Sequence, residues 1–176
     1  MNRILTAMLV FILASGLLIT GCTSPPEPGS VAQAPQVGKL APDFKLLSLE
    51  GSSVSLSDFR GQPTLINFWA SWREPCRDEM SFIQEIYMEW TGKSPSVAIL
   101  AINLGESSSR AEKFMRDFNL SFPVLLDTKQ EVAAKYNIRG IPTTFFIDKD
   151  GIIQYIMAGA FSNTAEIEAN LDKIMY

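Results

Sequence analysis

The sequence predicts an α/β domain in which helices flank a central mixed β-sheet. Two continuous apolar segments, Thr64–Trp69 and Val97–Asn103, are typical of strands that are buried on both faces. Segments in which apolar residues recur at helical spacing follow these strands. A last pair of strands surrounds the turn at residues 148–151. Strands that alternate with helices and then end in a hairpin and a helix indicate a mixed sheet.

The N-terminal part of this domain is expected to begin with a β-hairpin extension. Residues 43–48 and 53–56 would pair around a turn at Glu50 and Gly51. After the first buried strand, Pro75 suits the start of a helix, because its missing N–H group is not needed there. The buried face of this helix is marked by apolar residues at helical spacing, namely Met80, Ile83, Tyr87 and Trp90.

The C-terminal part completes the sheet and its helical cover. Helices are expected at 110–119 and 130–136, and strands at 143–147 and 152–157. The turn between these strands contains Gly151, which can adopt a positive φ angle. Thr164 is expected to cap a last helix that ends near Met175, with Glu166 and Glu168 in its first turn.

Composition excludes several classes of protein. The chain has 176 residues, of which 47% are hydrophobic and 19% charged, which suits one globular domain with short additions. Two cysteines are too few for a disulfide-dense scaffold. The absence of histidine excludes a Ser-His-Asp triad, a Cys-His dyad and a histidine-bound metal. A net charge of −4 gives no basic surface for nucleic acid. No cofactor or metal is expected.

The N-terminus has the pattern of a secretion signal. Arg3 precedes an apolar run at residues 4–19, which ends in Ile19-Thr20-Gly21-Cys22. This ending resembles the lipobox of bacterial lipoproteins, which are cut before the cysteine and acylated on its thiol. The alternative is an uncleaved membrane helix in which the cysteine is incidental. A lipidated Cys22 would take no part in redox chemistry.

These observations divide the chain into three parts. We expect a lipoprotein signal peptide at 1–21, a flexible tether at 22–38 and a single domain at 39–176. Four prolines in the tether restrict the backbone and remove donors, which favours an extended, poorly packed segment. The expected location is the extracytoplasmic side of the cell envelope, where the lipid on Cys22 anchors the domain to the membrane.

The most informative segment is Phe68-Trp69-Ala70-Ser71-Trp72-Arg73-Glu74-Pro75-Cys76, which leaves a buried strand and enters a helix. It resembles the active-site turn of thioredoxin-fold thiol–disulfide proteins, Trp-Ala-x-Trp-Cys-x-Pro-Cys. Residues 38–44 resemble the start of the redoxin (AhpC/TSA) superfamily, which includes the peroxiredoxins. Residues 140–145 resemble the thioredoxin loop whose proline, here Pro142, is cis. Glu79 after Cys76 completes a similarity to the ResA/TlpA-type membrane-tethered reductases of cytochrome c maturation. The resemblance implies a thioredoxin-like fold over residues 38–176.

The sequence departs from this family at one decisive position. Arg73 stands where the resemblance implies the first, nucleophilic cysteine, and only Cys76 of the pair is present. Thiol–disulfide exchange passes through a mixed disulfide that an internal thiol normally resolves. The domain therefore has no intramolecular dithiol cycle.

The reactivity of Cys76 depends on opposing effects. The start of a helix and the charge of Arg73 favour the thiolate, whereas burial and Glu79 oppose it. Cys76 is either a reactive thiol or a small buried side chain without a reaction. Arg73 is either a solvated cation or the binding group for an anion or carboxylate. Glu79 is either a surface residue or a shielded acid–base group beside the thiol.

The remaining site residues are expected to form the walls of the active site. They are Trp69, Trp72, Arg73, Pro75 and Pro142. The expected partners are protein thiols or disulfides, or a small thiol reductant, together with the membrane.

Three functions remain open. The first is an envelope redox protein that uses one thiol with an outside partner. The second is a single-cysteine peroxidase, although Arg73 and Trp69 stand where the peroxiredoxin pattern has Thr or Ser and Pro. The third is a non-catalytic lipoprotein that keeps the fold for binding.

Overall fold

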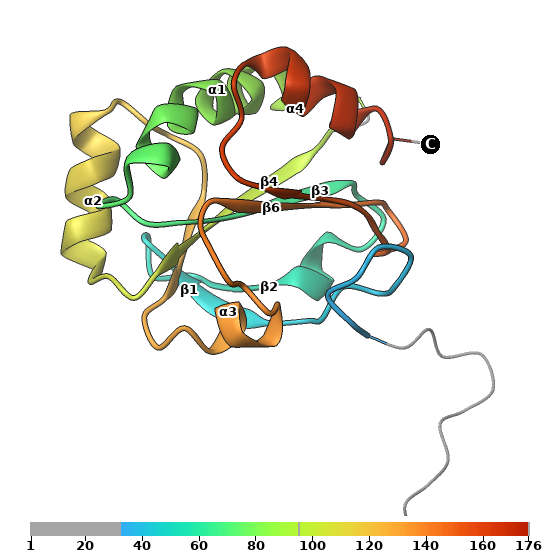
Figure 1. Ribbon diagram of the computed structural model, residues 1–176, viewed down its shortest axis with the longest axis horizontal. Coiled ribbons are helices and arrows are strands. Elements are labelled where there is room, and N and C mark those ends of the chain that lie inside the picture. The colour runs from blue at the N-terminus through green and yellow to red at the C-terminus, as the bar shows by residue number, and fades with distance from the viewer. Residues whose placement is uncertain (1–32, 95, 176) are drawn as a thin grey trace, which may run out of the picture. The chain divides into compact units, whose positions relative to one another are not determined.

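A mixed β-sheet flanked by helices forms the centre of the computed structural model, which describes residues 33–94 and 96–175 (Figure 1). The strands are β1 (Lys45–Ser48), β2 (Ser53–Ser55), β3 (Thr64–Trp69), β4 (Ala98–Leu104), β5 (Val124–Asp127), β6 (Thr143–Ile147) and β7 (Ile153–Ala158). The helices are α1 (Glu74–Trp90), α2 (Ser108–Asp117), α3 (Glu131–Lys135) and α4 (Thr164–Leu171), with the 3-10 turn η1 (Leu56–Phe59). The expected mixed α/β architecture is confirmed.

The sheet has the strand order β2-β1-β5-β4-β3-β6-β7. Strands β3, β4 and β5 run parallel, whereas β6 and β7 on one side and β1 and β2 on the other join antiparallel. The β1–β2 pair is the expected N-terminal hairpin. Every residue of β3 and β4 is buried, as their continuous apolar runs indicated.

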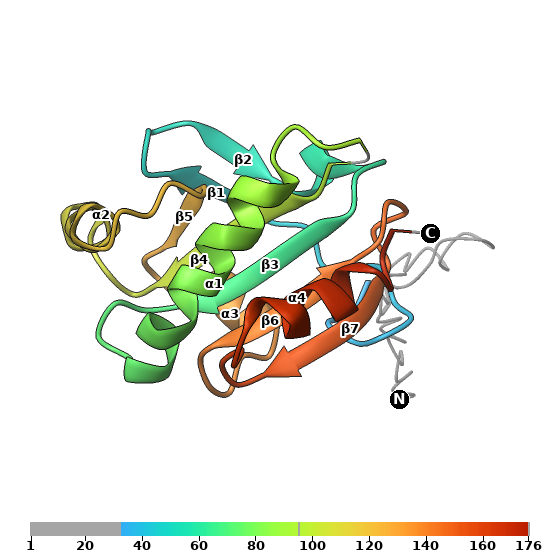
Figure 2. The same ribbon diagram turned by 90° about the horizontal axis from the view of Figure 1, so that it is seen from above.

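Each face of the sheet carries its own hydrophobic core. Helices α1 and α4 lie over one face (Figure 2), and α2 contributes Phe114 to the same core. On β3, Leu65 and Trp69 point to this face, whereas Ile66 and Phe68 pack on the opposite face with α3 and η1. Because side chains alternate along a strand, Asn67 points toward α1. This alternation places a polar side chain beneath the helix that carries Cys76.

The structure corrects three expectations about the elements. Strand β5 was not predicted, and it pairs with both β1 and β4. Thr164 is the first residue of α4, and the cap is Asn163, whose side chain accepts a hydrogen bond from the Glu166 N–H group. Helix α4 ends at Leu171 and does not reach Met175.

The end of the expected tether is packed against the domain. Gln33 forms a β-bridge with Leu40, and the N–H group of Gly38 donates to the carbonyl of Ile153 across 2.8 Å. We expected the extended tether to continue to Gly38, but residues 33–38 are hydrogen-bonded among themselves, to Leu40 and, through Gly38, to Ile153 of β7. The remainder of the tether and the signal sequence, including Cys22, lie outside the described residues. Within the described ranges, no helix has the length and apolarity that a membrane crossing requires.

Candidate active site

Cys76 lies in the first turn of α1 and points into the core. Strand β3 ends at Trp69, and α1 begins at Glu74 with Pro75 in its first turn. Cys76 shares the inward face of the helix with Met80 and Ile83, and its side chain is 0% exposed. The thiol is therefore covered on all sides in this structure.

Burial is the main influence on the Cys76 thiol. It raises the pKa of Cys76 to about 12, and the negative charge of Glu79 acts in the same direction. A hydrogen bond with the backbone of Ala70 and the charge of Arg73 lower the pKa, but burial outweighs both. The Cys76 thiol is therefore protonated at neutral pH. The competition that the sequence left open is thus decided against the thiolate.

Arg73 lies at the surface but is not simply solvated. It precedes the first residue of α1, and its Nε donates a hydrogen bond to the carbonyl oxygen of Ile141 across 3.1 Å. Within residues 33–94 and 96–175, no carboxylate forms a salt bridge with Arg73. The side chain therefore joins the turn before α1 to the loop before β6, and its remaining N–H groups are free to bind a ligand.

Glu79 is a buried acid on the inward face of α1, not a surface residue. Its Oε1 accepts a hydrogen bond from Asn67 Nδ2 at 2.8 Å, and its Oε2 accepts one from the Phe161 N–H group at 3.0 Å. Asn67 Nδ2 also donates to Thr144 Oγ1 at 2.9 Å. Burial raises the pKa of Glu79 to about 7, although the two hydrogen bonds favour the charged form. Glu79 can therefore exchange a proton near neutral pH.

The two tryptophans of the turn have different environments. Trp69 is fully buried and packs against Phe114, with 5.1 Å between the ring centroids. Trp72 is 60% exposed and lies on the rim of a second surface pocket, beside Gly105 and Arg139. Trp69 is thus part of the core, and Trp72 is available to a partner.

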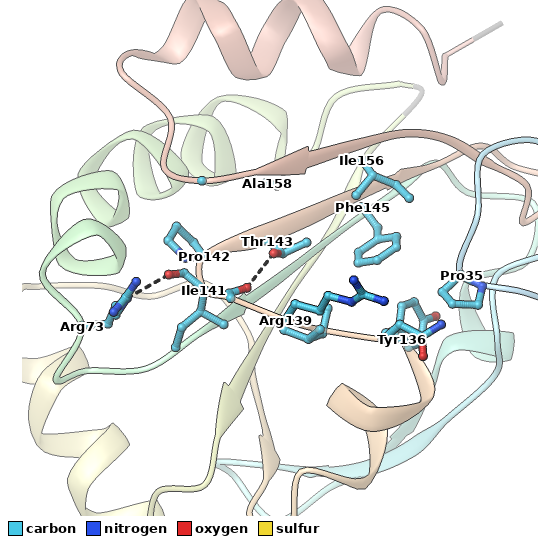
Figure 3. Close-up of a pocket in the computed structure, with 14 residues that line it drawn as sticks. Pro35, Arg73, Tyr136, Arg139, Ile141, Pro142, Thr143, Phe145, Ile156 and Ala158 are labelled. Atoms are coloured by element: carbon cyan, nitrogen blue, oxygen red, sulfur yellow. Dashed lines mark hydrogen bonds between the residues drawn. The ribbon is translucent and has the colours of Figure 1, made fainter.

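The loop before β6 forms one wall of a surface pocket beside the site. The Ile141–Pro142 peptide bond is cis, as the resemblance implied. The pocket has a volume of about 440 Å³ (Figure 3). Arg73 and Pro142 lie at one end, Pro35 lies at the other, and Arg139 lies between them. Cys76 does not line this pocket.

A buried carboxylate that the sequence did not reveal, Glu106, is hydrogen-bonded to the turn between β3 and α1. Glu106 Oε2 accepts hydrogen bonds from the Ser71 N–H group at 2.7 Å and from Asn103 Nδ2 at 2.8 Å. Its Oε1 accepts from Ser71 Oγ at 2.7 Å and forms a salt bridge with Arg110 Nε at 2.8 Å. The available signal was position, because Glu106 lies two residues after the end of β4 and parallel strands end at the same edge of a sheet. Arg139 was also missed, and no sequence pattern marked it.

No metal site accompanies these groups in the described part of the chain, where no cluster of three or more Cys, Asp or Glu side chains is arranged to hold an ion. The site consists of one covered thiol, one buried acid of raised pKa and an open groove beside Pro142. A ligand could bind in the groove, and Cys76 neither lines this groove nor is exposed to solvent.

Comparison with known proteins identifies the family. The AhpC/TSA family pattern matches residues 37–156, which is more than half of the chain. The chain belongs to the AhpC/TSA family. This AhpC/TSA protein is 41% identical over 138 residues to the thiol–disulfide oxidoreductase ResA of Geobacillus kaustophilus, a match that covers 78% of each chain. It is 38% identical over 137 residues to the thioredoxin-like protein YneN of Bacillus subtilis, covering 78% of this chain and 79% of YneN.

A solved structure supports the same assignment. The putative thiol:disulfide interchange protein DsbE from Chlorobium tepidum superimposes with a TM-score of 0.70 at 31% identity. The match covers 79% of this chain and 95% of the DsbE chain. The expected thioredoxin-like fold and redoxin family are therefore confirmed. The AhpC/TSA protein is a homologue of the ResA- and DsbE-type thiol–disulfide oxidoreductases.

Proposed function

We propose that this AhpC/TSA protein is a membrane-anchored thioredoxin-like protein of the cell envelope that binds thiol–disulfide partners without a dithiol cycle. The observation that carries the proposal is the state of Cys76, whose side chain is 0% exposed. Its pKa is raised to about 12. A thiol that is both covered and protonated is a poor nucleophile, because the thiolate is the reacting species.

The position of Arg73 supports the absence of a dithiol cycle. Arg73 stands three residues before Cys76, where the resemblance to thioredoxin-fold proteins implies the nucleophilic cysteine. The other cysteine of the chain is Cys22, for which we propose lipidation. Without a second thiol in the domain, a mixed disulfide with a partner would have no internal group to resolve it.

The groove beside Pro142 supports a binding role. It is open to solvent, and its lining combines arginines with apolar side chains. The names of the ResA and DsbE relatives point to thiol–disulfide exchange, so protein thiols or disulfides are the proposed partners. In this proposal the protein retains the family's partner recognition, and Cys76 has become a core residue.

The location is part of the proposal. The sequence Ile19-Thr20-Gly21-Cys22 resembles a lipobox, and the Pro-rich residues after it would hold the domain away from the membrane. Mass spectrometry of the intact protein from its native host tests this part. We expect a chain that begins at Cys22 and carries acyl groups, whereas an unprocessed N-terminus would contradict the anchor.

A second function, one-thiol exchange at Cys76, is favoured by one observation. Glu79 has a pKa near 7 and lies close enough to Cys76 to affect its charge, so Glu79 could accept the thiol proton if α1 opened. A peroxidase reaction would use the same thiol. Burial of Cys76 opposes both reactions, because neither a disulfide nor a peroxide has access to the sulfur. We expect no sulfenic acid at Cys76 with stoichiometric peroxide.

Insulin-disulfide reduction tests the proposal. We expect negligible turnover by the wild-type protein with dithiothreitol as reductant, and appreciable turnover after Arg73→Cys, which creates a Cys-x-x-Cys pair. The matched control is Arg77→Cys, which adds an exposed cysteine beside Cys76 without that spacing. Robust turnover by the wild-type protein would overturn the proposal. Equal turnover by the two variants would show that any added thiol suffices, which contradicts the role given to position 73.

A further inference from the structure

The groove beside Pro142 is a basic site on an acidic protein. The chain carries 19 acidic and 15 basic residues. Nevertheless, the residues that line the groove include Arg73 and Arg139 and no aspartate or glutamate. The adjoining pocket at Trp72 also lacks acidic residues and shares Arg139. Positive charge is thus concentrated where a partner would dock.

Arg139 has an unused guanidinium. It is exposed, and no carboxylate within residues 33–94 and 96–175 forms a salt bridge with it. In Figure 3 its side chain lies along the groove, between the Pro142 end and the Pro35 end. By contrast, Arg110 pairs with Glu106 and Arg116 pairs with Glu112. A free guanidinium fork suits a carboxylate, which it can bind through two parallel hydrogen bonds.

The floor of the groove is apolar and is formed by side chains of two sheet strands. Phe145 of β6 and Ile156 of β7 are paired across the two strands and both line the groove. Phe145 is buried, whereas Ile156 is partly exposed. Ile156 therefore provides contact area for an apolar group beside a bound carboxylate, and the buried Phe145 ring supports it. Trp72, on the rim of the adjoining pocket, adds an exposed aromatic surface.

We propose that this groove selects an extended acidic segment of a partner protein, binding one of its carboxylates on Arg139 and a neighbouring apolar side chain on Ile156. This preference for an acidic segment rests on the proposed binding function and specifies which kind of partner segment is bound. Charge complementarity supports an acidic occupant, and the apolar floor distinguishes a peptide from a free anion. Arg73, tied to Ile141 through Nε, presents its outer N–H groups at the Pro142 end of the same groove.

Peptide binding to the full-length protein in detergent micelles tests this selection. The probes are the fluorescein-labelled peptide amides Gly-Val-Glu-Val-Glu-Val and Gly-Val-Gln-Val-Gln-Val, followed by fluorescence anisotropy. We expect the acidic peptide to bind about threefold more tightly than the neutral one, as is usual for a salt bridge to an exposed arginine. Arg139→Gln should abolish this ratio, and Arg139→Lys should keep part of it, because lysine retains the charge but not the fork. The control Arg116→Gln, on α2, should leave the ratio unchanged.

The outcomes separate the selection from the binding function. If both peptides bind equally and Ala158→Trp, which fills the groove, abolishes both, the binding function stands and the acidic selection is wrong. If neither peptide binds, both proposals fail. An unchanged ratio in Arg139→Gln would also overturn the selection. A fivefold or greater gain in affinity from Glu27→Gln would assign the groove to the chain's own tether and would overturn an external partner.

Discussion

The Nε atom of Arg73 donates a hydrogen bond to the carbonyl oxygen of Ile141 across 3.1 Å. The bond joins the turn before α1 to the residue that precedes Pro142. Arg73 thus occupies the position at which the resemblance places a nucleophile and uses it to contact the loop on the other side of the site. Because Arg73 is exposed, this contact competes with water and contributes little to the stability of the fold.

Replacing Arg73 by alanine should therefore leave the fold nearly intact. We expect the free energy of unfolding to fall by less than about 1 kcal/mol, as is usual for exposed polar contacts. Urea denaturation measures this change, with Arg77→Ala as the control. Arg77 is exposed one turn further along α1, and within the described residues its guanidinium contacts only the Phe118 ring. A loss above about 3 kcal/mol for Arg73→Ala alone would assign Arg73 a structural role that its exposure does not support.

The buried Glu79 carboxyl should make stability depend on pH. Its pKa rises from an ordinary value near 4.5 to about 7 in the folded protein, so the folded state holds this proton more tightly than the unfolded state. Between these two values, the free energy of unfolding should fall as pH rises, by about 3 kcal/mol from this group. Urea denaturation from pH 4 to 8 measures the slope.

The control for this pH dependence compares two glutamates of α1. Glu79→Gln should remove the fall between pH 4.5 and 7, whereas Glu85→Gln, at an exposed position, should leave it unchanged. A wild-type stability that rises through this pH window would contradict the assignment.

The Glu106 carboxylate should stabilise the turn between β3 and α1. Glu106→Gln puts an amide group against donors on Ser71, Asn103 or Arg110. We expect the free energy of unfolding to fall by about 2–3 kcal/mol, because hydrogen bonds to a buried charge are stronger than neutral ones. Hydrogen exchange of the Ser71 and Trp72 amides should become faster, since the turn loses its anchor.

Glu112→Gln is the matched control for Glu106. Glu112 lies on α2, is only half-buried and has a long contact of 3.7 Å with Arg116. Its replacement should change the free energy of unfolding by less than about 0.5 kcal/mol. Equal losses from the two variants would mean that Glu106 has no special role in holding the turn.

Most of the fold was predictable because the strongest sequence patterns belong to its centre. Strand β3 has the predicted bounds Thr64–Trp69, since six consecutive residues buried on both faces give a continuous apolar run. Strand β5 was missed because it is only four residues long and depends on pairing with β1 and β4. The cap of α4 was misplaced by one residue, because Asn163 and Thr164 both have side chains that can cap a helix.

The chemistry of the site was less predictable, because it depends on how deeply side chains are buried and on contacts between residues far apart in the chain. Sequence located Cys76, Arg73, Glu79 and Pro142, but the sign of the Cys76 pKa shift required the degree of burial around the thiol. The Arg73 contact with Ile141 joins residues that are 68 positions apart in the chain. Such contacts depend on how the loops pack in three dimensions, and no local sequence pattern predicts that packing.

The alkylation rate of Cys76 against pH is the most direct test of the central claim that this thiol is covered and protonated. The full-length protein would be treated with iodoacetamide from pH 6 to 10, natively and in urea, and the Cys76 peptide quantified by mass spectrometry. At pH 8 we expect native alkylation to be about a thousandfold slower than in urea, because a pKa near 12 replaces one near 8.5. The native rate should still be rising at pH 10. A native rate that equals the rate in urea, or that reaches a plateau near pH 7, would contradict the account.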